Sequence, residues 1–306
     1  MPLSPNQRGA LFMVISQAAF TLNDTLVKIA TGYLPVSQIM LVRGLFATTL
    51  MLALVWRLGH FRPLRTALNP TVALRVIGEV GGTVFFLLAL AHLPLANASA
   101  VFQSLPLVVT MGAALVLGEY VGPRRWLAIA VGFVGVMIIV RPGLEGFNAF
   151  SIYVLLSVLF CTLRDLVTRL LPADLPTTYV SLLTAVSVTV TGGVMVIFQG
   201  DWEPLNTSVI AILAGAAVLI LIGYQTVILS TRTGDLSYVA PFRYTALLWA
   251  IGAGFIVFGS LPDALTLVGS AIVVASGIYM VYRERKVGRD KPATESIEST
   301  IAPDGL

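Results

Sequence analysis

Of the 306 residues, 57% are hydrophobic and 11% are charged, whereas about 25% of the residues in ordinary soluble domains are charged. The mean hydropathy is +0.90. This composition excludes a water-soluble globular domain, which would need a far more polar surface, and it predicts that lipid covers most of the chain.

Ten apolar segments of about 20 residues follow one another, each long enough to cross the roughly 30 Å hydrocarbon core of a bilayer. We expect them at 9–31, 36–57, 71–91, 95–117, 124–140, 149–170, 178–199, 208–230, 236–258 and 264–283. Proline and glycine residues punctuate the short connections between them. The sequence therefore predicts an all-α integral membrane protein with ten transmembrane helices. The polar segment 286–306 is expected to be a disordered cytoplasmic tail.

The distribution of Lys and Arg predicts the orientation of the chain, because cytoplasmic loops carry an excess of these residues. If the N-terminus is inside, the cytoplasmic loops and the tail hold most of the 19 basic residues, and the opposite side holds Arg141 alone. We therefore expect both termini in the cytoplasm. The pI of about 9.4 then reflects this topology, and we expect no binding of nucleic acid.

Two parts of the sequence resemble each other at an offset of 141 residues. The segment 21–24 (TLND) falls on 162–165 (TLRD), Gly82 falls on Gly223, and Gly118 falls on Gly259. We expect a duplicated five-helix unit, with one copy in residues 1–143 and the other in 144–285. Because five is odd, the second copy must be inverted in the membrane, an arrangement that is typical of transporters. Chance similarity among hydrophobic helices is the alternative.

The order of these signals resembles the drug/metabolite transporter superfamily, and in particular its ten-helix EamA-type exporters. The residues that carry the resemblance are Pro35, Arg43, 89–90 (AL), 95–100 (LANASA), Pro106, 118–119 (GE) and 135–136 (GV), followed more loosely by 240–241 (AP), Gly259 and 277–278 (GI). The second half departs from the pattern, since Ser260 stands where the first half has Glu119. The overall likeness is greatest to bacterial amino-acid exporters, including the aromatic type.

The resemblance implies a secondary transporter of the bacterial inner membrane that exports amino acids or related small metabolites by alternating access. Nucleotide-sugar, drug or other metabolite transport within the same superfamily is the alternative. No phosphate-binding GxxxxGK[ST] motif is present, and with one cysteine and two histidines we expect no metal, no cofactor and no enzymatic activity. The expected partners are a small-molecule substrate and the lipid bilayer, and nothing in the sequence requires more than a monomer.

Ionisable residues inside a bilayer are energetically costly and usually face the interior of the bundle, so their positions indicate the transport pathway. The candidate gating residues are Asp24, Lys28, Arg43, Glu79, Arg164, Asp165, Arg169 and Arg243. Asp24, Lys28 and Arg43 are expected near the extracellular side. The residues expected near the cytoplasmic side are Glu79, Arg164, Asp165 and Arg243. Permanent structural ion pairs are the alternative role. A protonatable carboxylate could couple transport to a proton gradient, or the protein could be a uniporter.

A substrate also needs polar and aromatic partners in the apolar wall of a cavity. The candidate cavity residues are Gln17, Asn23, Phe85, Asn97, Ser99, Phe102, Gln103, Tyr224, Gln225, Tyr238, Phe242, Tyr244 and Trp249. Pro106 and Pro241 lie inside spans, where proline kinks a helix, and we expect them to act as hinges. An intramembrane enzyme and a channel or receptor are alternative classes, and neither has a motif in this sequence to support it.

Overall fold

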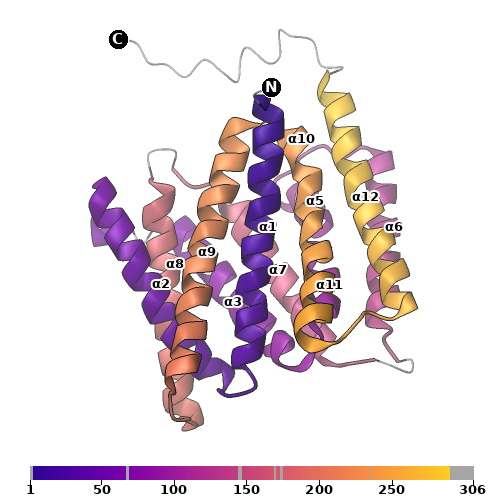
Figure 1. The fold of residues 1–306 in the computed structure, drawn as a ribbon. Coiled ribbons are helices and arrows are strands. Elements are labelled where there is room, and N and C mark those ends of the chain that lie inside the picture. Colours follow the sequence, from indigo (N-terminus) through magenta and orange to yellow (C-terminus); the bar gives the residue numbers. More distant parts are fainter. Residues whose placement is uncertain are drawn as a thin grey trace, which may run out of the picture.

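The computed structural model describes residues 3–66, 69–143, 147–168, 170–172, 175–234 and 236–289. Within these ranges the chain forms helices and no strands (Figure 1). In chain order the elements are α1 (Pro5–Ala30), α2 (Val36–Leu58), the 3-10 helix η1 (Leu64–Thr66), α3 (Pro70–His92), α4 (Leu95–Phe102), α5 (Leu105–Val116), α6 (Pro123–Val140), α7 (Phe150–Thr168), α8 (Thr177–Gln199), α9 (Thr207–Thr233), α10 (Leu236–Val239), the 3-10 helix η2 (Ala240–Tyr244), α11 (Thr245–Phe258) and α12 (Ala264–Arg289).

Ten segments of the described chain are long and apolar enough to cross a membrane, which confirms the ten spans predicted from the sequence. The N-terminal end of α1 and the C-terminal end of α12 lie at the same end of the bundle (Figure 1). We call this the N-terminal end of the bundle and the other the far end. α12 continues to Arg289, four residues into the segment predicted as a tail, and 290–306 lie outside the described residues.

Two spans that the sequence analysis treated as continuous helices are interrupted. The fourth span breaks between α4 and α5, and Pro106 lies in the first turn of α5. The ninth span passes from α10 through η2, whose first turn contains Pro241, into α11. Proline has no N–H to donate, and its ring clashes with the carbonyl of the preceding turn, so a helix tends to end just before it. Both interruptions follow from this property.

The helix ends carry the signals expected from local chemistry. Ser4 accepts a hydrogen bond from the N–H of Gln7, while the Gln7 side chain accepts one from the N–H of Ser4, forming a capping box at the start of α1. Asn69 and Asn206 accept from backbone N–H groups at the starts of α3 and α9. These caps fix where the spans begin and therefore which residues face the interior.

The helices pack in four main pairs: α1 with α9, α3 with α7, α2 with α8, and α6 with α12. In the last pair, which lies at one edge of the bundle in Figure 1, a Cβ atom on Gly135 would lie 2.8 Å from the carbonyl oxygen of Gly269. The reverse substitution is equally crowded. Only glycine allows these two backbones to approach so closely, and the pair forms a tightly packed support beside the interior helices.

Hydrogen bonds between these helices recur at the offset found in the sequence. Ser16 donates to the carbonyl oxygen of Gly223 at 2.8 Å, and Ser157 donates to the carbonyl oxygen of Gly82 at 2.7 Å. Both serines and both glycines are 141 positions apart in the chain. Thr48 and Thr189, also separated by 141 residues, hydrogen-bond to each other at 3.0 Å.

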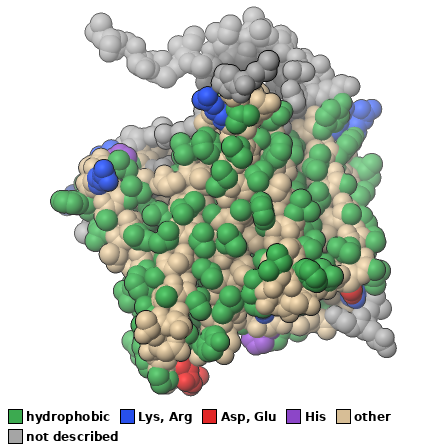
Figure 2. Space-filling model, viewed as in Figure 1, with side chains coloured by type: hydrophobic (Ala, Val, Ile, Leu, Met, Phe, Trp, Pro, Cys, Tyr) green, Lys and Arg blue, Asp and Glu red, His purple; other side chains and the backbone are tan. Residues whose placement is uncertain are grey.

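Hydrophobic side chains cover the middle of the visible surface, and charged side chains lie mainly at its two ends (Figure 2). Large apolar residues are exposed in the described chain, among them Leu115, Phe198 and Ile256 at 69%, 85% and 81%. In water such a surface would be strongly unfavourable, whereas in a bilayer it faces hydrocarbon. The chain is therefore a multi-pass membrane protein.

Candidate functional site: a central cavity

A cavity of about 400 Å³ lies among the helices, within the range of roughly 300–1,000 Å³ that is common for pockets binding small molecules. A smaller hollow of about 80 Å³ extends from it between α2, α3, α8 and α9, and Arg43, Arg75, Glu79 and Tyr224 line both. Three walls are single helix faces, since their lining residues recur at the spacing of helical turns. They are Gln17, Phe20, Thr21 and Asp24 on α1, Arg75, Glu79, Thr83 and Phe86 on α3, and Ser157, Cys161, Arg164, Asp165 and Thr168 on α7.

A network of charged and polar groups lies on the side of the cavity nearer the N-terminal end. Nη1 of Arg164 lies 3.2 Å from Oε2 of Glu79, and its Nε lies 2.8 Å from Oδ1 of Asp165. The Tyr224 hydroxyl donates to Oε1 of Glu79 at 3.2 Å. Arg164 is therefore neutralised by two carboxylates, which is the condition under which a buried guanidinium is tolerated in a low-dielectric interior.

A second group lies deeper in the cavity and contains Asn23, Asp24 and Arg43. Nη1 of Arg43 donates to Oδ1 of Asn23 at 3.1 Å, and Nδ2 of Asn23 donates to Oδ1 of Asp24 at 2.9 Å. Among the described residues, Arg43 forms no ion pair, in contrast to Arg164. The neutral amide of Asn23 thus stands between a guanidinium and a carboxylate.

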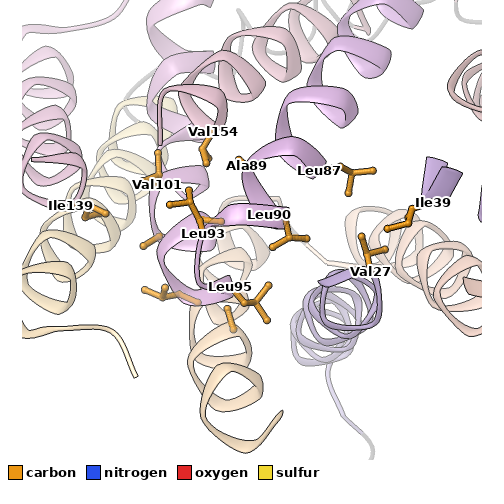
Figure 3. Close-up of a cluster of buried hydrophobic side chains, with 14 of the residues drawn as sticks. Val27, Ile39, Leu87, Ala89, Leu90, Leu93, Leu95, Val101, Ile139 and Val154 are labelled. Carbon is orange, nitrogen blue, oxygen red and sulfur yellow. The ribbon is translucent and has the colours of Figure 1, made fainter. Parts of the chain in front are cut away.

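The cavity opens toward one end of the bundle. Its exposed lining residues, within the described ranges, are Thr168 at the end of α7 and Arg243 in η2, both near the N-terminal end. At the far end, a cluster of buried apolar side chains fills the space between α1, α2 and α3. Val27, Ile39 and Leu90 have no exposed surface there, and Figure 3 shows them beside Leu87. This cluster excludes water from the far end, so the cavity is a one-ended pocket.

Lys28 lies at the closed end, but it has a different partner from the charged residues of the cavity. Its Nζ donates to the carbonyl oxygens of Leu90 and Leu93 at 2.7 and 2.8 Å. These are orphan carbonyls at the C-terminal end of α3, where the helix dipole also favours a cation. Lys28 therefore caps a neighbouring helix. Arg169, the candidate predicted beside Asp165, lies outside the described residues.

The structure brings most of the other predicted gating residues and many of the predicted cavity residues together around the cavity. Those that line it are Gln17, Asn23, Asp24, Arg43, Glu79, Ser99, Phe102, Gln103, Pro106, Arg164, Asp165, Tyr224 and Arg243. The predicted residues that do not line it are Phe85, Asn97, Gln225, Tyr238, Pro241, Phe242, Tyr244 and Trp249.

The aromatic residues outside the cavity have identifiable places. Phe85 stacks on Phe160, with ring centroids 5.5 Å apart, and Tyr238 packs on Phe242 at 6.0 Å. Trp249 is 45% exposed on the surface. Aromatic side chains of these types are suited to a cavity wall. Each of them, however, lies on a different side of its helix from the cavity-lining residues, because the position of a residue along the helix determines the side that it faces.

The two interrupted spans meet at their breaks. The side chain of Gln103, at the end of α4, donates to the carbonyl oxygens of Tyr244 and Arg243 at 3.4 and 3.5 Å. These carbonyls belong to η2, whose 3-10 geometry changes the pattern of backbone pairing. Pro106 lines the cavity beside one break and Pro241 lies within the other, so both predicted hinge residues are located at interruptions.

Phe20, Arg75 and Cys161 are among the cavity residues that the sequence analysis missed. The signal that could have found them is helical spacing. Phe20 precedes Asp24 by four residues, Arg75 precedes Glu79 by four, and Cys161 precedes Asp165 by four. Residues four apart share a helix face. Within the described chain, no group of three His, Cys, Asp or Glu residues is placed to hold a metal ion.

Comparison with known proteins adds the family to this geometry. Residues 7–141 match the EamA-like transporter family. The riboflavin transporter of Vibrio cholerae is 31% identical over 287 residues, which are 92% of this chain and 95% of that protein. The riboflavin transporter of Rhizobium johnstonii is 29% identical, with 93% and 94% covered. The pseudopaline exporter CntI of Pseudomonas aeruginosa is 27% identical, with 91% and 97% covered.

A solved crystal structure has the same fold, with a TM-score of 0.61 at 18% sequence identity, covering 90% of this chain and 98% of that one. The relatives are transporters of small metabolites and not enzymes, in agreement with the sequence analysis. Their lengths match the whole ten-span chain. This chain belongs to the EamA-like transporter family of the drug/metabolite transporter superfamily.

Proposed function

We propose that this chain is a secondary transporter of the bacterial inner membrane whose substrate is riboflavin or a metabolite of similar chemistry, with a planar heteroaromatic ring and polar groups. The observation that carries the proposal is the one-ended cavity of about 400 Å³. A carrier needs a central site that opens to one side at a time, whereas a channel needs a path through both ends. The closed apolar cluster around Val27, Ile39 and Leu90 suits the carrier.

The walls of the cavity support this choice of substrate. Phe20, Phe86, Phe102 and Tyr224 line it from four different helices, and Phe86 and Phe102 form a pair with centroids 5.1 Å apart. Aromatic rings provide stacking or edge contacts for a planar heterocycle. The riboflavin transporters of two different bacteria are among the relatives, which favours a flavin over the other substrates that the relatives' names give.

The proposed mechanism is alternating access between two inverted five-helix copies, residues 1–143 and 144–285. It is supported by the hydrogen bonds from Ser16 to Gly223 and from Ser157 to Gly82, which relate to each other by the 141-residue offset. An exchange of conformations between the copies would close the pocket at the N-terminal end and open it at the far end. The excess of basic residues on the N-terminal side indicates that both termini are cytoplasmic and that this conformation faces inward.

Amino-acid export remains a prediction, and one observation keeps it as a second candidate. Asp24 and Arg43 lie near each other in the cavity wall, and a zwitterion could place its ammonium against the carboxylate and its carboxylate against the guanidinium. The direction of transport is also a prediction. A secondary transporter runs in the direction that the gradients of its substrate and of any coupled ion impose.

The test is counterflow in liposomes that contain the purified protein and are preloaded with unlabelled riboflavin. We expect saturable entry of labelled riboflavin, absent from protein-free liposomes, with little competition from phenylalanine or leucine. Repeating the assay with an imposed pH gradient measures proton coupling. Entry of labelled amino acids without entry of riboflavin would replace the flavin with the second candidate. Equal entry with and without preloaded substrate would contradict a carrier mechanism.

A further inference from the structure

The group formed by Asn23, Asp24 and Arg43 has unused hydrogen-bonding capacity inside the cavity. An arginine has five N–H donors and an ionised aspartate about four acceptor positions. In the described part of the chain, Arg43 makes one hydrogen bond, to Asn23, and Asp24 accepts one, from Asn23. Arg43 is only 7% exposed and Asp24 is half-buried, and both side chains line the cavity.

Comparison with Arg164 shows that the lack of hydrogen-bond partners is specific to the group of Asn23, Asp24 and Arg43. Arg164 is ion-paired with Glu79 and Asp165, whereas Asp24 and Arg43 are held apart by the Asn23 amide. Buried polar groups are normally satisfied, and a buried charge without a partner is costly. The remaining donors of Arg43 and the remaining acceptors of Asp24 belong to side chains that line the same cavity. They form a donor and an acceptor side by side, in fixed positions.

A flavin ring presents the matching pattern on its pyrimidinedione edge, where one imide N–H stands between two carbonyl groups. We propose that Asp24 accepts a hydrogen bond from this imide N–H while Arg43 donates to an adjacent carbonyl oxygen, with Asn23 positioning both side chains. This inference rests on the proposed function and names the part of the substrate that the closed end of the cavity recognises. The Phe20 ring lies on the same face of α1, one turn before Asp24, where it would contact the flavin plane.

Asn23 has a positioning role in this arrangement. A direct contact between Asp24 and Arg43 would neutralise both and leave less capacity for a ligand. Because the amide donates to one and accepts from the other, it holds them in a geometry that a neutral imide can complete. The edge of the ring lacks a net charge, so it suits a guanidinium and a carboxylate presented together better than either one alone.

The test uses the intrinsic fluorescence of riboflavin to measure its dissociation constant for the purified protein, and compares it with 3-methylriboflavin. Methylation at N3 removes the imide N–H and leaves the ring and the ribityl chain intact. A site built to bind an N–H group discriminates strongly against an analogue that lacks it. We expect at least about tenfold weaker binding of the methylated compound by the wild-type protein, a measurement that requires no variant to fold.

A variant comparison assigns this discrimination to Asp24. In Asp24→Ala the ratio of the two dissociation constants should fall close to one, because the acceptor is gone. In Asp165→Asn, which changes the aspartate 141 residues later at the open side of the cavity, the ratio should remain as in the wild type even if both constants change. Arg43→Lys should weaken riboflavin and 3-methylriboflavin together, since the carbonyl contact is common to both.

The outcomes separate this inference from the proposed function. Equal binding of riboflavin and 3-methylriboflavin by the wild type would overturn the imide contact while leaving riboflavin as a substrate. No binding of either compound by a folded protein would overturn both. Displacement of riboflavin by equimolar phenylalanine, with the ratio unchanged in Asp24→Ala, would show that Asp24 and Arg43 serve a zwitterion instead.

Discussion

The closed and open ends of the cavity have different side chains at positions 141 residues apart. Val27 at the closed end has no exposed surface, whereas Thr168 at the open end is exposed. Asn23 at the closed side is neutral and precedes Asp24, whereas Arg164 at the open side is charged and precedes Asp165. Positions 141 residues apart in the chain thus carry side chains of different polarity and charge at the two ends of the cavity.

This difference separates apolar packing at the closed end from ion-paired side chains at the open end. Apolar packing at the far end needs no directional partners and excludes water by burial alone. On the open side, the ion pair of Arg164 with Glu79 joins α7 to α3, and Asp165 on α7 pairs with the same guanidinium. The closed end therefore depends on hydrophobic contact, whereas the open end carries paired charges. Variants that exchange or remove these features test the comparison.

The largest effect is expected from Arg164→Met. The substitution removes the ion-pair partner of two carboxylates and leaves Glu79, which is 10% exposed, with only the Tyr224 hydroxyl as a hydrogen-bond donor in the described chain. Removing one partner of a buried pair costs about 3–5 kcal/mol, and thermal unfolding of the purified protein should show the loss. Glu79→Gln in the same chain should restore part of it. Arg243→Met is the matched control, because that arginine lines the same cavity and is exposed. Equal melting temperatures for both single variants would show that the network contributes no stability.

A smaller loss is expected from Lys28→Met at the closed end. The ammonium donates to Leu90 and Leu93 at the end of α3, and hydrogen bonds to a charged group are worth about 1.5–3 kcal/mol. Unfolding measurements should show a loss of about 2 kcal/mol. Lys28→Arg, which keeps the charge and the donors, should retain more of the stability than Lys28→Met. If the two variants were equally destabilised, packing of the side chain and not the capping bonds would explain the effect.

Arg164 and Lys28 also show what the sequence could and could not predict. The ten spans follow from the length and polarity that a bilayer requires, and the charged cavity residues follow from the cost of placing charge in hydrocarbon. The Arg164–Glu79 contact joins the two candidates that the sequence placed on the same side. The partners of Lys28 are backbone carbonyls 62 and 65 residues away, and no side-chain pattern encodes them.

Cys161 shows a second limit of the sequence analysis. It is the single cysteine of the chain and is buried, and it lines the cavity beside Gly82. Its helical phase, and not its chemistry, places it there. The breaks at Gln103 and in η2 show the same limit, since Pro106 and Pro241 indicate that a helix is disturbed, but only the tertiary packing determines that the two breaks contact each other.

A third prediction exchanges the residues that distinguish the two ends. Val27→Thr gives the closed end the residue type of the open end, and burying a hydroxyl in an apolar cluster costs about 1 kcal/mol. In the proposed mechanism the cavity is open either at the N-terminal end or at the far end. That cost shifts the equilibrium between these two conformations about fivefold toward the one open at the far end. Cys161, the single cysteine, is a natural reporter: a membrane-impermeant maleimide applied from the far side should react about fivefold faster.

Thr168→Val is the reciprocal variant. It removes a hydroxyl that accepts a hydrogen bond from Nε of Arg75 at an exposed position, so stability should fall by about 1 kcal/mol or less, and closure of the open end should become easier. Cys161→Ser in each background controls for labelling elsewhere. Unchanged far-side labelling in Val27→Thr would indicate that the apolar cluster does not determine which end is closed.

The smallest effect is expected at the loops of the far end. Arg141, the C-cap of α6 with a left-handed φ of 52°, forms an ion pair with Asp263, just before α12. The Arg141 hydrogen bond, together with those from Thr266, holds the pKa of Asp263 at about 2, below its ordinary value of 3.8. A depressed carboxylate pKa stabilises the folded state above the ordinary value, and this contribution is lost as the pH falls from about 4 to about 2.

Asp263 is 53% exposed, so solvent screens the pair and we expect Asp263→Asn to cost less than about 1 kcal/mol at neutral pH. The difference in melting temperature between wild type and variant should shrink as the pH falls through that interval. An asparagine side chain can also accept the hydrogen bond from the Thr266 N–H, so the variant keeps the cap and loses only the ion pair with Arg141. A difference that stayed constant with pH would contradict a contribution from the charge of Asp263. A shrinking difference would therefore show that charge, and not capping geometry, ties α6 to α12 at the closed end.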